Sequence, residues 1–384
     1  PDIDGVCTQY ASEKILSCVS IATMLMMEKP RPGRIWFVGP FPPPLNGQSN
    51  YNVAMAAHLR TMGDVEIIDT GGSTRRKIAA YLRSAWTLLT ASRQGDVIYT
   101  SAPGQGSLWI FGLVMLALRC RGLPFFVHHH SYRPLRSGGM KAMRFATMMG
   151  GGGQRHILLS EGMRRAFVDR YLGGDMQRAF SLSNAYLFYT QESAIHRPDR
   201  PLTLGHMSVL AWEKGVDVVL GVFEAAIKAG ADVRLRLAGP IRTAGLEAVI
   251  AETAARYPGR FEFLGRVDGE AKRRFYDSID LFLLPSRLPD EAEPLVLLEA
   301  YAAGVDVMAT GRGCIPERLI ASDRLLVGDS TVDIDSVLAV ADAISANWTA
   351  TRRGCRQHAA RLHENAREEA RILFAAMRLH SDLS

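Results

Sequence analysis

Cysteine is scarce in this sequence. The 384 residues hold five cysteines, which are odd in number, widely scattered and free of C-x-x-C spacing: Cys7, Cys18, Cys120, Cys314 and Cys355. This pattern argues against a disulfide framework and a zinc site, and it favours a reducing cytoplasm. Cys314 has no candidate base beside it in the sequence, which favours a small packed residue over a nucleophile.

Long hydrophobic runs are absent from the sequence as well. The segment Leu108 to Leu118 comes nearest to the roughly 18 to 20 apolar residues that span a bilayer, and two arginines follow it, which predicts a buried or membrane-facing helix. Residues 1–30 lack a basic start and a clear cleavage site. We therefore expect an N-terminal extension of unknown role there and no secretory signal.

Apolar content and positive charge are what the chain does have. Of its 384 residues 47% are hydrophobic, which is enough to bury the cores of two domains, and the formal net charge of +6 favours anionic partners. Phosphates, acidic lipids and nucleic acid all fit that description. No nucleic-acid reader module is evident, so we expect no nucleic-acid partner.

Short apolar runs alternate with helical patterns along two successive stretches. Strands are predicted at Arg34–Val38, Val65–Ile68, Val97–Ser101, Phe125–His130 and His156–Ser160, with a further strand ending at Ser183-Asn184, and then at Leu202–Val209, Val233–Ala238, Phe261–Leu264, Leu281–Leu284 and Val305–Ala309. Helices are predicted at Gln48–Met62, Thr74–Ser92, Ser107–Cys120, from Glu161, at Gly215–Ala229, Ala244–Tyr257 and Asp342–Leu383. This alternation predicts an α/β fold with two doubly wound parallel sheets, joined by a polar, proline-bearing linker at 186–201.

Two acids flank an apolar run in the second stretch. Glu291 precedes Pro294, and seven residues separate Glu291 from Glu299. Proline suits a first helical position, so the run predicts a helix start whose free amides attract a phosphate. The spacing favours two acids that grip opposite ends of one ligand. Taken alone, the pair is equally typical of a solvated loop acid and a helix-dipole partner.

This acid pair is one of nine short motifs whose order resembles the GT-B glycosyltransferases of family 4. They are Gly39-Pro40, Asn46-Gly47, Ser183-Asn184, Lys214-Gly215, Ala238-Gly239-Pro240, Phe263-Leu264-Gly265, Leu284-Pro285-Ser286, Glu291-x7-Glu299 and Gly313-x-x-Pro316-Glu317. The resemblance runs from about Arg34 to the end. It implies a Rossmann-like acceptor domain at 31–185, a nucleotide-sugar domain at 202–365 and a C-terminal helix, 366–384, that packs back on the first domain.

The resemblance also implies roles for individual residues. Lys214 matches the diphosphate lysine, Gly47 the glycine that lets the backbone approach the phosphates, Glu299 the ribose acid and Glu291 the acid at the sugar hydroxyls. Backbone amides around Pro294, Leu295 and Val296 would meet the sugar or phosphates, and the loops at Gly239 and Val267 would bind the base. No cofactor and no metal is expected, because lysine charge and helix-start amides stabilise a leaving diphosphate.

One position departs from the family pattern. Val209 stands where the family often has an arginine, five residues before Lys214. The diphosphate would then rely on Lys214 and helix amides, or recruit another cation such as Arg242, Arg266 or Arg287. Glu317 is left without an assigned role.

Three consecutive histidines end a predicted strand at the edge where ligands of open α/β sheets gather. Alternation points His128 and His130 one way and His129 the other. By register with the family's strand-end histidine, His130 is expected near the reacting carbon, with His128 next. A metal site at these histidines is disfavoured, because no third ligand follows at a telling spacing.

Basic residues gather in the first domain, with Tyr81, Trp86, Leu88 and Leu89 among them. They are Arg75, Arg76, Lys77, Arg83, Arg93, Arg133, Arg136, Lys141, Arg144, Arg155, Arg164 and Arg165. Basic amphipathic helices suit a surface docked on anionic lipid, and a merely solvated face fits nearly as well.

These observations predict a retaining hexosyltransferase of envelope polysaccharide or glycolipid synthesis. It would use a GDP- or UDP-linked donor, marginally GDP-mannose, and a lipid-linked or saccharide acceptor. We expect it in the cytoplasm, peripheral on the inner face of the cytoplasmic membrane. Two alternatives stay open: a nucleotide-sugar epimerase or phosphorylase with the same fold, and a catalytically silent subunit that binds nucleotide-sugar.

Overall fold

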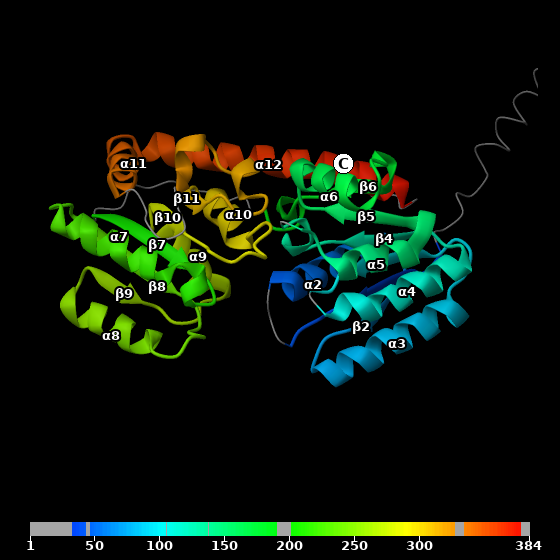
Figure 1. Cartoon of the computed structure of the whole chain (residues 1–384). Helices are drawn as coiled ribbons and strands as arrows, with labels where there is room; N and C mark the ends of the chain where they lie inside the picture. Colours follow the sequence, from blue (N-terminus) through cyan, green and yellow to red (C-terminus); the bar gives the residue numbers. More distant parts are fainter. Residues whose placement is uncertain are drawn as a thin grey trace, which may run out of the picture.

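The structure is a computed structural model that describes residues 33–43, 47–104, 106–136, 138–189, 201–326 and 334–377. The expected extension at 1–30 and positions 190–200 of the expected linker lie outside these ranges. The described residues form two parallel six-stranded sheets, each flanked by helices (Figure 1). The prediction of two doubly wound α/β domains is confirmed.

The first sheet has the strand order β2-β1-β3-β4-β5-β6. Its strands are β1 (Ile35–Gly39), β2 (Val65–Asp69), β3 (Val97–Ser101), β4 (Phe125–His128), β5 (Gln154–Leu158) and β6 (Ala179–Ser181). Its helices are α2 (Gly47–Arg60), α3 (Thr74–Ala91), α4 (Ser107–Arg121), α5 (Lys141–Gly150) and α6 (Glu161–Tyr171). Short 3-10 turns follow β4 and β6 as η1 (Arg133–Leu135) and η4 (Asn184–Tyr186).

The second sheet has the strand order β12-β11-β10-β7-β8-β9. Its strands are β7 (Leu202–Met207), β8 (Val233–Ala238), β9 (Phe261–Phe263), β10 (Leu281–Leu284), β11 (Asp306–Thr310) and β12 (Leu325–Leu326). Its helices are α7 (Val216–Lys228), α8 (Leu246–Arg256), α9 (Gly269–Asp277), α10 (Leu295–Ala302), α11 (Ile334–Ala346) and α12 (Trp348–Ala376).

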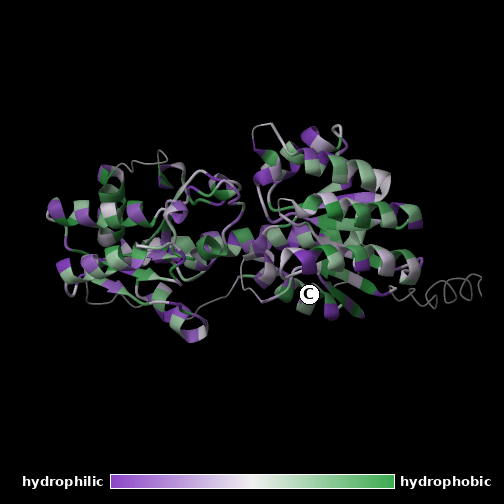
Figure 2. Cartoon of the chain, turned by 60° about the horizontal axis from the view of Figure 1, so that its bottom comes forward, coloured by the Kyte–Doolittle hydropathy of each residue, from purple (hydrophilic) through white to green (hydrophobic). Residues whose placement is uncertain are grey.

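Continuous apolar sequences form the central strands because helices cover both faces of each sheet. All residues of β1, β3, β4 and β10 are buried. Along the outer helices, hydrophobic and hydrophilic residues alternate in both lobes (Figure 2). The parallel register, for example Val38 beside Thr100 and Leu284 beside Ala309, aligns the carboxyl ends of the strands at one edge of each sheet.

The long helix α12 connects the two domains. It contacts α10 and α11 in the second domain and β6 and η4 in the first, and Figure 1 shows it extending along both. Near its end, Phe374 packs on His58 and Tyr186, and Glu369 accepts a hydrogen bond from the Ser183 amide at 2.8 Å. One apolar cluster therefore runs through both domains along this helix.

Some predicted elements differ from the observed ones. Strand β4 ends at His128, so His130 lies two residues beyond it, in the loop that leads to η1. The C-terminal helical stretch is two helices, which break at Asn347, where φ is −129° and ψ is 36°. Helices α5 and α9 were not expected. The α9 sequence carries few apolar residues, and only Phe275 and Tyr276 of this helix are buried.

Candidate active site

A cleft of about 520 Å³ lies where the two domains face each other. The first domain contributes Gly47, Gln48, Asn50, His130 and Asn184 to its lining. The second contributes residues from five segments, namely 207–209 with Lys214, Gly239-Pro240, Arg266-Val267 with Lys272, Leu284, and 290–296 with Glu299. All ten residues that the sequence analysis assigned to catalysis or binding line this one cleft. Their roles remain predictions.

Two side chains of the second domain hold the loop that carries Glu291. Lys214 Nζ donates to Glu291 Oε2 at 2.7 Å, and Ser286 Oγ donates to the same oxygen at 2.8 Å. The Lys214 and Glu291 side chains are 21% and 11% exposed, so this ion pair is mostly shielded from water. The diphosphate lysine and the sugar acid expected from the sequence therefore meet directly.

Two glycines fix the backbone around this pair. Gly215 has φ of 77°, and a Cβ there would lie 2.1 Å from the Pro285 carbonyl oxygen, so only glycine lets the Lys214 segment approach that loop. Gly313 has φ of 54°, and a Cβ there would lie 2.3 Å from the Glu291 carbonyl oxygen. The neighbouring Cys314 amide donates to the Ala292 carbonyl at 2.8 Å.

Glu299 lies one turn inside α10, as the sequence predicted, and it is held by α9. Lys272 Nζ donates to Glu299 Oε1 at 2.6 Å, and the Tyr276 hydroxyl donates to Oε2 at 2.9 Å. Burial raises the pKa of Tyr276 well above its ordinary value, so this hydroxyl stays protonated. Lys272 and Tyr276 were missed from the sequence. Their spacing of four, typical of one helix face, was the available signal.

The N-terminus of α10 opens into the cleft. Pro294 is the residue before the helix, and Leu295 and Val296, the first two helical residues, also line the cleft. Amides in the first turn of a helix have no partner within the helix and carry partial positive charge. On the opposite wall Gly47 begins α2, and a Cβ added there would meet no protein atom within 4 Å. The backbone at Gly47 is therefore accessible from the cleft.

The three histidines point as alternation predicted. The rings of His128 and His130 lie 4.2 Å apart, whereas His129 Nε2 lies 2.9 Å from His156 Nδ1 on the other side. Burial lowers the pKa of His130 to about 3, so the ring facing the cleft is neutral at pH 7. Its buried Nε2 has no hydrogen-bond partner within the described residues. A ligand polar group at this point would satisfy it.

Gly239 and Val267 belong to two further loops that line the cleft. Gly239 has φ of 125°, its amide donates to the Gly265 carbonyl at 2.7 Å, and both loops follow neighbouring strands, β8 and β9. Gly239 itself is buried, whereas Pro240 beside it and Arg266 of the other loop are exposed and suit packing against a flat ring. These contacts do not distinguish one nucleobase from another.

The structure corrects the list of cations that would compensate for Val209. Val209 lines the cleft with 42% of its surface exposed. Arg287 is engaged with Asp217, at 2.7 and 2.9 Å, and neither Arg287 nor Arg242 lines the cleft. Arg266 does line it, together with the unexpected Lys272.

Cys314 and Glu317 lie outside the lining of the cleft. Cys314 is fully buried, and burial raises the pKa of its thiol to about 12, which agrees with a packed residue. Glu317 joins the domains elsewhere, because its carboxylate accepts hydrogen bonds from Ser160 Oγ at 2.6 Å and the Gly162 amide at 3.2 Å. Among the described residues no group of three or more His, Cys, Asp or Glu side chains is arranged to hold a metal ion.

The basic and aromatic residues of the first domain separate into two groups. Tyr81 and Leu88 are buried in the core, so these two residues do not belong to a lipid-facing surface. Four apolar residues of α3 are exposed instead, at 44%, 49%, 68% and 38% of their surfaces: Ile78, Leu82, Trp86 and Leu89. No helix within the described ranges is long and apolar enough to cross a membrane.

Comparisons with known proteins show what this chain is similar to. Residues 200–348 match the family model described as glycosyl transferases group 1. A GDP-mannose-dependent monoacylated alpha-(1-6)-phosphatidylinositol monomannoside mannosyltransferase of Corynebacterium glutamicum is 30% identical over 138 residues, which cover 35% of each chain. The matched segment thus spans about a third of that relative's length.

Solved structures share the fold across both domains. HepE of Anabaena in complex with UDP has a TM-score of 0.64 at 17% identity, covering 89% of this chain and 100% of that chain. A glycosyltransferase from Rickettsia africae has a TM-score of 0.62 at 14% identity, covering 88% of this chain and 98% of that chain. The chain thus has the fold of the GT-B glycosyltransferases, and its residues 200–348 are similar to the group 1 glycosyl transferases.

Proposed function

We propose that the chain is a retaining glycosyltransferase of family 4 that moves a hexose from a nucleotide-sugar to an acceptor hydroxyl. The observation that carries this proposal is the single cleft. It gathers a paired lysine and acid, a second acid one turn into a helix, and a neutral histidine from the opposite domain. The two acids stand apart and each has its own partner, which suits the binding of one extended ligand. Acid–base chemistry in which two carboxylates share a proton would place them together.

The donor is proposed to lie along the second domain. Its base would contact the loops at Gly239 and Val267, and its ribose hydroxyls would donate to Glu299. The diphosphate would meet Lys214, the Leu295 and Val296 amides and the backbone at Gly47. Glu291 would then orient the sugar hydroxyls beside His130. Every residue named in this pose lines the cleft.

Transfer would break the bond between the sugar C1 and the diphosphate oxygen and form a bond from C1 to the acceptor oxygen. The negative charge that develops on the leaving diphosphate would be met by Lys214 and by the α10 amides, without a metal ion. The acceptor would enter on the same face, from the His130 side, and its proton would pass to the leaving phosphate. Neutral His130 would accept a hydrogen bond and carry no charge itself.

Mannose from GDP-mannose is the marginally favoured donor. The Corynebacterium relative is named as GDP-mannose-dependent, whereas the Anabaena structure contains UDP. The base-end loops at Gly239 and Val267 suit either nucleotide. Both GDP- and UDP-sugars therefore belong in the first test.

A lipid-linked acceptor in envelope polysaccharide or glycolipid synthesis is the favoured acceptor class, with a saccharide as the other. The Corynebacterium relative is named for a phosphatidylinositol mannoside. The exposed apolar residues of α3 alternate with Arg75, Arg83 and other basic residues, and α3 packs beside α4, where Trp109 and Leu113 are also exposed (Figure 1). Such a surface suits peripheral contact with anionic lipid on the cytoplasmic side.

Turnover with a panel of UDP-, GDP- and ADP-sugars, with and without membrane extract, tests the proposal. We expect nucleoside diphosphate release that depends on the extract, and a product whose anomeric configuration matches the donor. Free sugar or a rearranged nucleotide-sugar without acceptor would instead indicate an epimerase or phosphorylase. Donor binding without any turnover would indicate a silent binding subunit.

A further inference from the structure

One ion pair crosses directly from the acceptor side of the cleft to the loop of the donor-sugar acid. Arg133 Nε donates to Asp290 Oδ1 at 2.5 Å, and Arg133 Nη2 donates to Asp290 Oδ2. The Tyr132 amide adds a hydrogen bond to the Asp290 carbonyl at 3.3 Å. The pair is therefore bidentate, the geometry that only a guanidinium provides.

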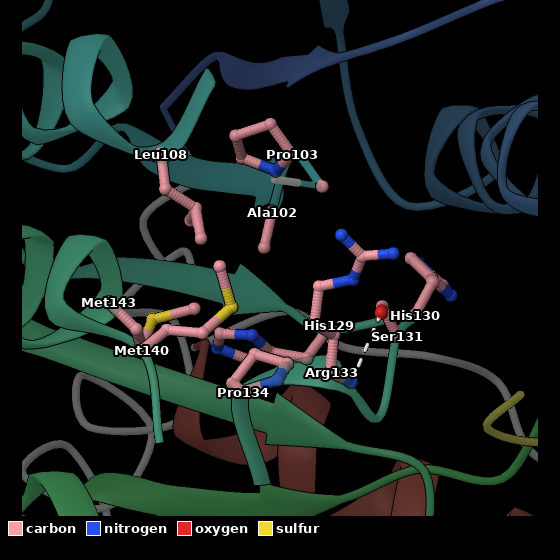
Figure 3. A pocket seen from close by; sticks show the side chains of 11 residues that line it. Ala102, Pro103, Leu108, His129, His130, Ser131, Arg133, Pro134, Met140 and Met143 are labelled. Carbon is pink, nitrogen blue, oxygen red and sulfur yellow. Dashed lines mark hydrogen bonds between the residues drawn. The ribbon is translucent and has the colours of Figure 1, made fainter. Parts of the chain in front are cut away.

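The positions of the two partners link the two halves of the site. Arg133 follows His130 by three residues, and in Figure 3 both side chains lie on one side of a small cavity, with Met140 and Met143 on the other. Asp290 lines the main cleft and is the residue immediately before Glu291. Adjacent residues of one loop thus face opposite ways, Asp290 to Arg133 and Glu291 to Lys214.

Other contacts between the domains differ in burial and place. The carboxylate of Glu293 is fully buried and binds Arg318, the Ser183 hydroxyl at 2.8 Å and the Asn184 amide at 2.5 Å. Arg133 and Asp290 are 31% and 26% exposed, and they reach the loop beside Glu291 itself. The Glu293 cluster therefore holds the domains together, whereas the Arg133 pair acts on one loop at the edge of the cleft.

The donor would alter the restraints on Glu291. In the empty cleft its carboxylate is held by Lys214 and by Ser286. When Lys214 turns to a diphosphate, that restraint is lost. Ser286 still holds the carboxylate, and the Glu291 amide still donates to the Leu288 carbonyl at 3.2 Å. The neighbouring residues are held by the Arg133 pair at Asp290 and by the Cys314 contact with Ala292.

We propose that Arg133 and Asp290 are a positioning pair for sugar transfer, through which the acceptor domain fixes Glu291 against the donor sugar. The role rests on the proposed function. It predicts an effect on the transfer step, because misplacement by about 1 Å lowers a rate by roughly 100-fold. It predicts no effect on binding of a bare nucleotide, which contacts neither residue in the proposed pose.

The test compares Arg133→Lys, Asp290→Asn, the double variant and Glu317→Gln as a matched control. Glu317→Gln weakens another contact between the domains outside the lining of the cleft. The probes are GDP and UDP for binding, and GDP-mannose and UDP-glucose with membrane extract for turnover. We expect Arg133→Lys and Asp290→Asn each to lower kcat by about 10- to 100-fold, with unchanged Kd for GDP or UDP. The double variant should be no worse than either single one.

Several results would overturn this role. They are wild-type kcat in Arg133→Lys, an equal loss of kcat in Glu317→Gln, or a loss of bare-nucleotide binding that matches the loss of kcat. Thermal unfolding within about 2 °C of the wild type checks that the variants fold. A wild-type chain that releases no nucleotide from either donor would refute the proposed function instead, and this is visible before any variant is compared.

Discussion

The two acids of the cleft are expected to have separable effects on binding. Glu299→Gln removes the charge that would accept the ribose hydroxyls. A hydrogen bond to a charged group contributes about 1.5 to 3 kcal/mol, so a loss near 2 kcal/mol weakens bare GDP or UDP binding roughly 30-fold. Lys272 loses its charged partner in this variant, but its side chain is 36% exposed and remains hydrated, so we expect little change in stability.

Glu291→Gln is the matched comparison, since it changes the same chemical group in the same cleft. It releases Lys214 from its ion pair, and bare-nucleotide binding should therefore stay unchanged or tighten by up to about 1 kcal/mol. The extra affinity that the sugar gives GDP-mannose or UDP-glucose over the bare nucleotide should fall. Calorimetric titration of both variants with both ligand forms measures all four quantities. Equal losses for bare and sugar-bearing nucleotide in both variants would refute the division of roles.

Three further predictions follow from other features. Val209→Arg restores a cation to the cleft and should tighten GDP or UDP binding about tenfold, and an unchanged Kd would show that its charge is already supplied. Trp86→Ala should weaken co-sedimentation of the protein with phosphatidylglycerol vesicles roughly tenfold. Ile372→Ala, on α12, is the control and should not weaken it, although Ile372 is 50% exposed. Equal behaviour of the two variants would contradict docking through α3. Burial lowers the pKa of four histidines, to about 3 for His129 and His130 and well below the ordinary value for His128 and His156. The stability that their neutral rings contribute is therefore complete above about pH 6.5 and falls as the pH drops below that value. An unfolding temperature that is equal at pH 7.5 and pH 5 would contradict this last prediction.

The sequence predicts the buried strands well because their signal is local. Strands at Val97–Ser101, Val233–Ala238 and Leu281–Leu284 have the predicted bounds. Leu281–Leu284 is a continuous apolar run, Val97–Ser101 begins with one, and Val233–Ala238 alternates apolar residues with two arginines. Helix α5 was missed because its start has no capping side chain and four glycines stand at its end. Helix α9 was missed because its charged sequence hides the two residues that it buries.

The partners of the acids depended on tertiary structure. The motifs identified Lys214 and Glu291 separately, but their direct ion pair requires β7 and β10 to be neighbours in the sheet. Lys272 and Arg133 carry no motif, and each becomes notable only through a partner 27 or 157 residues away. Sequence spacing cannot reveal such contacts, because the Lys214 and Lys272 pairs depend on how the second domain folds and the Arg133 pair depends on how the two domains face each other.

A crystal structure of the chain with GDP or UDP in EDTA would test the central claim most directly. The account predicts the base between Gly239 and Val267, the ribose on Glu299, and the diphosphate at Lys214 and the Leu295 and Val296 amides. Lys214 should then have moved away from Glu291. A nucleotide bound outside this cleft, or a cleft that stays empty at saturating nucleotide, would contradict the account.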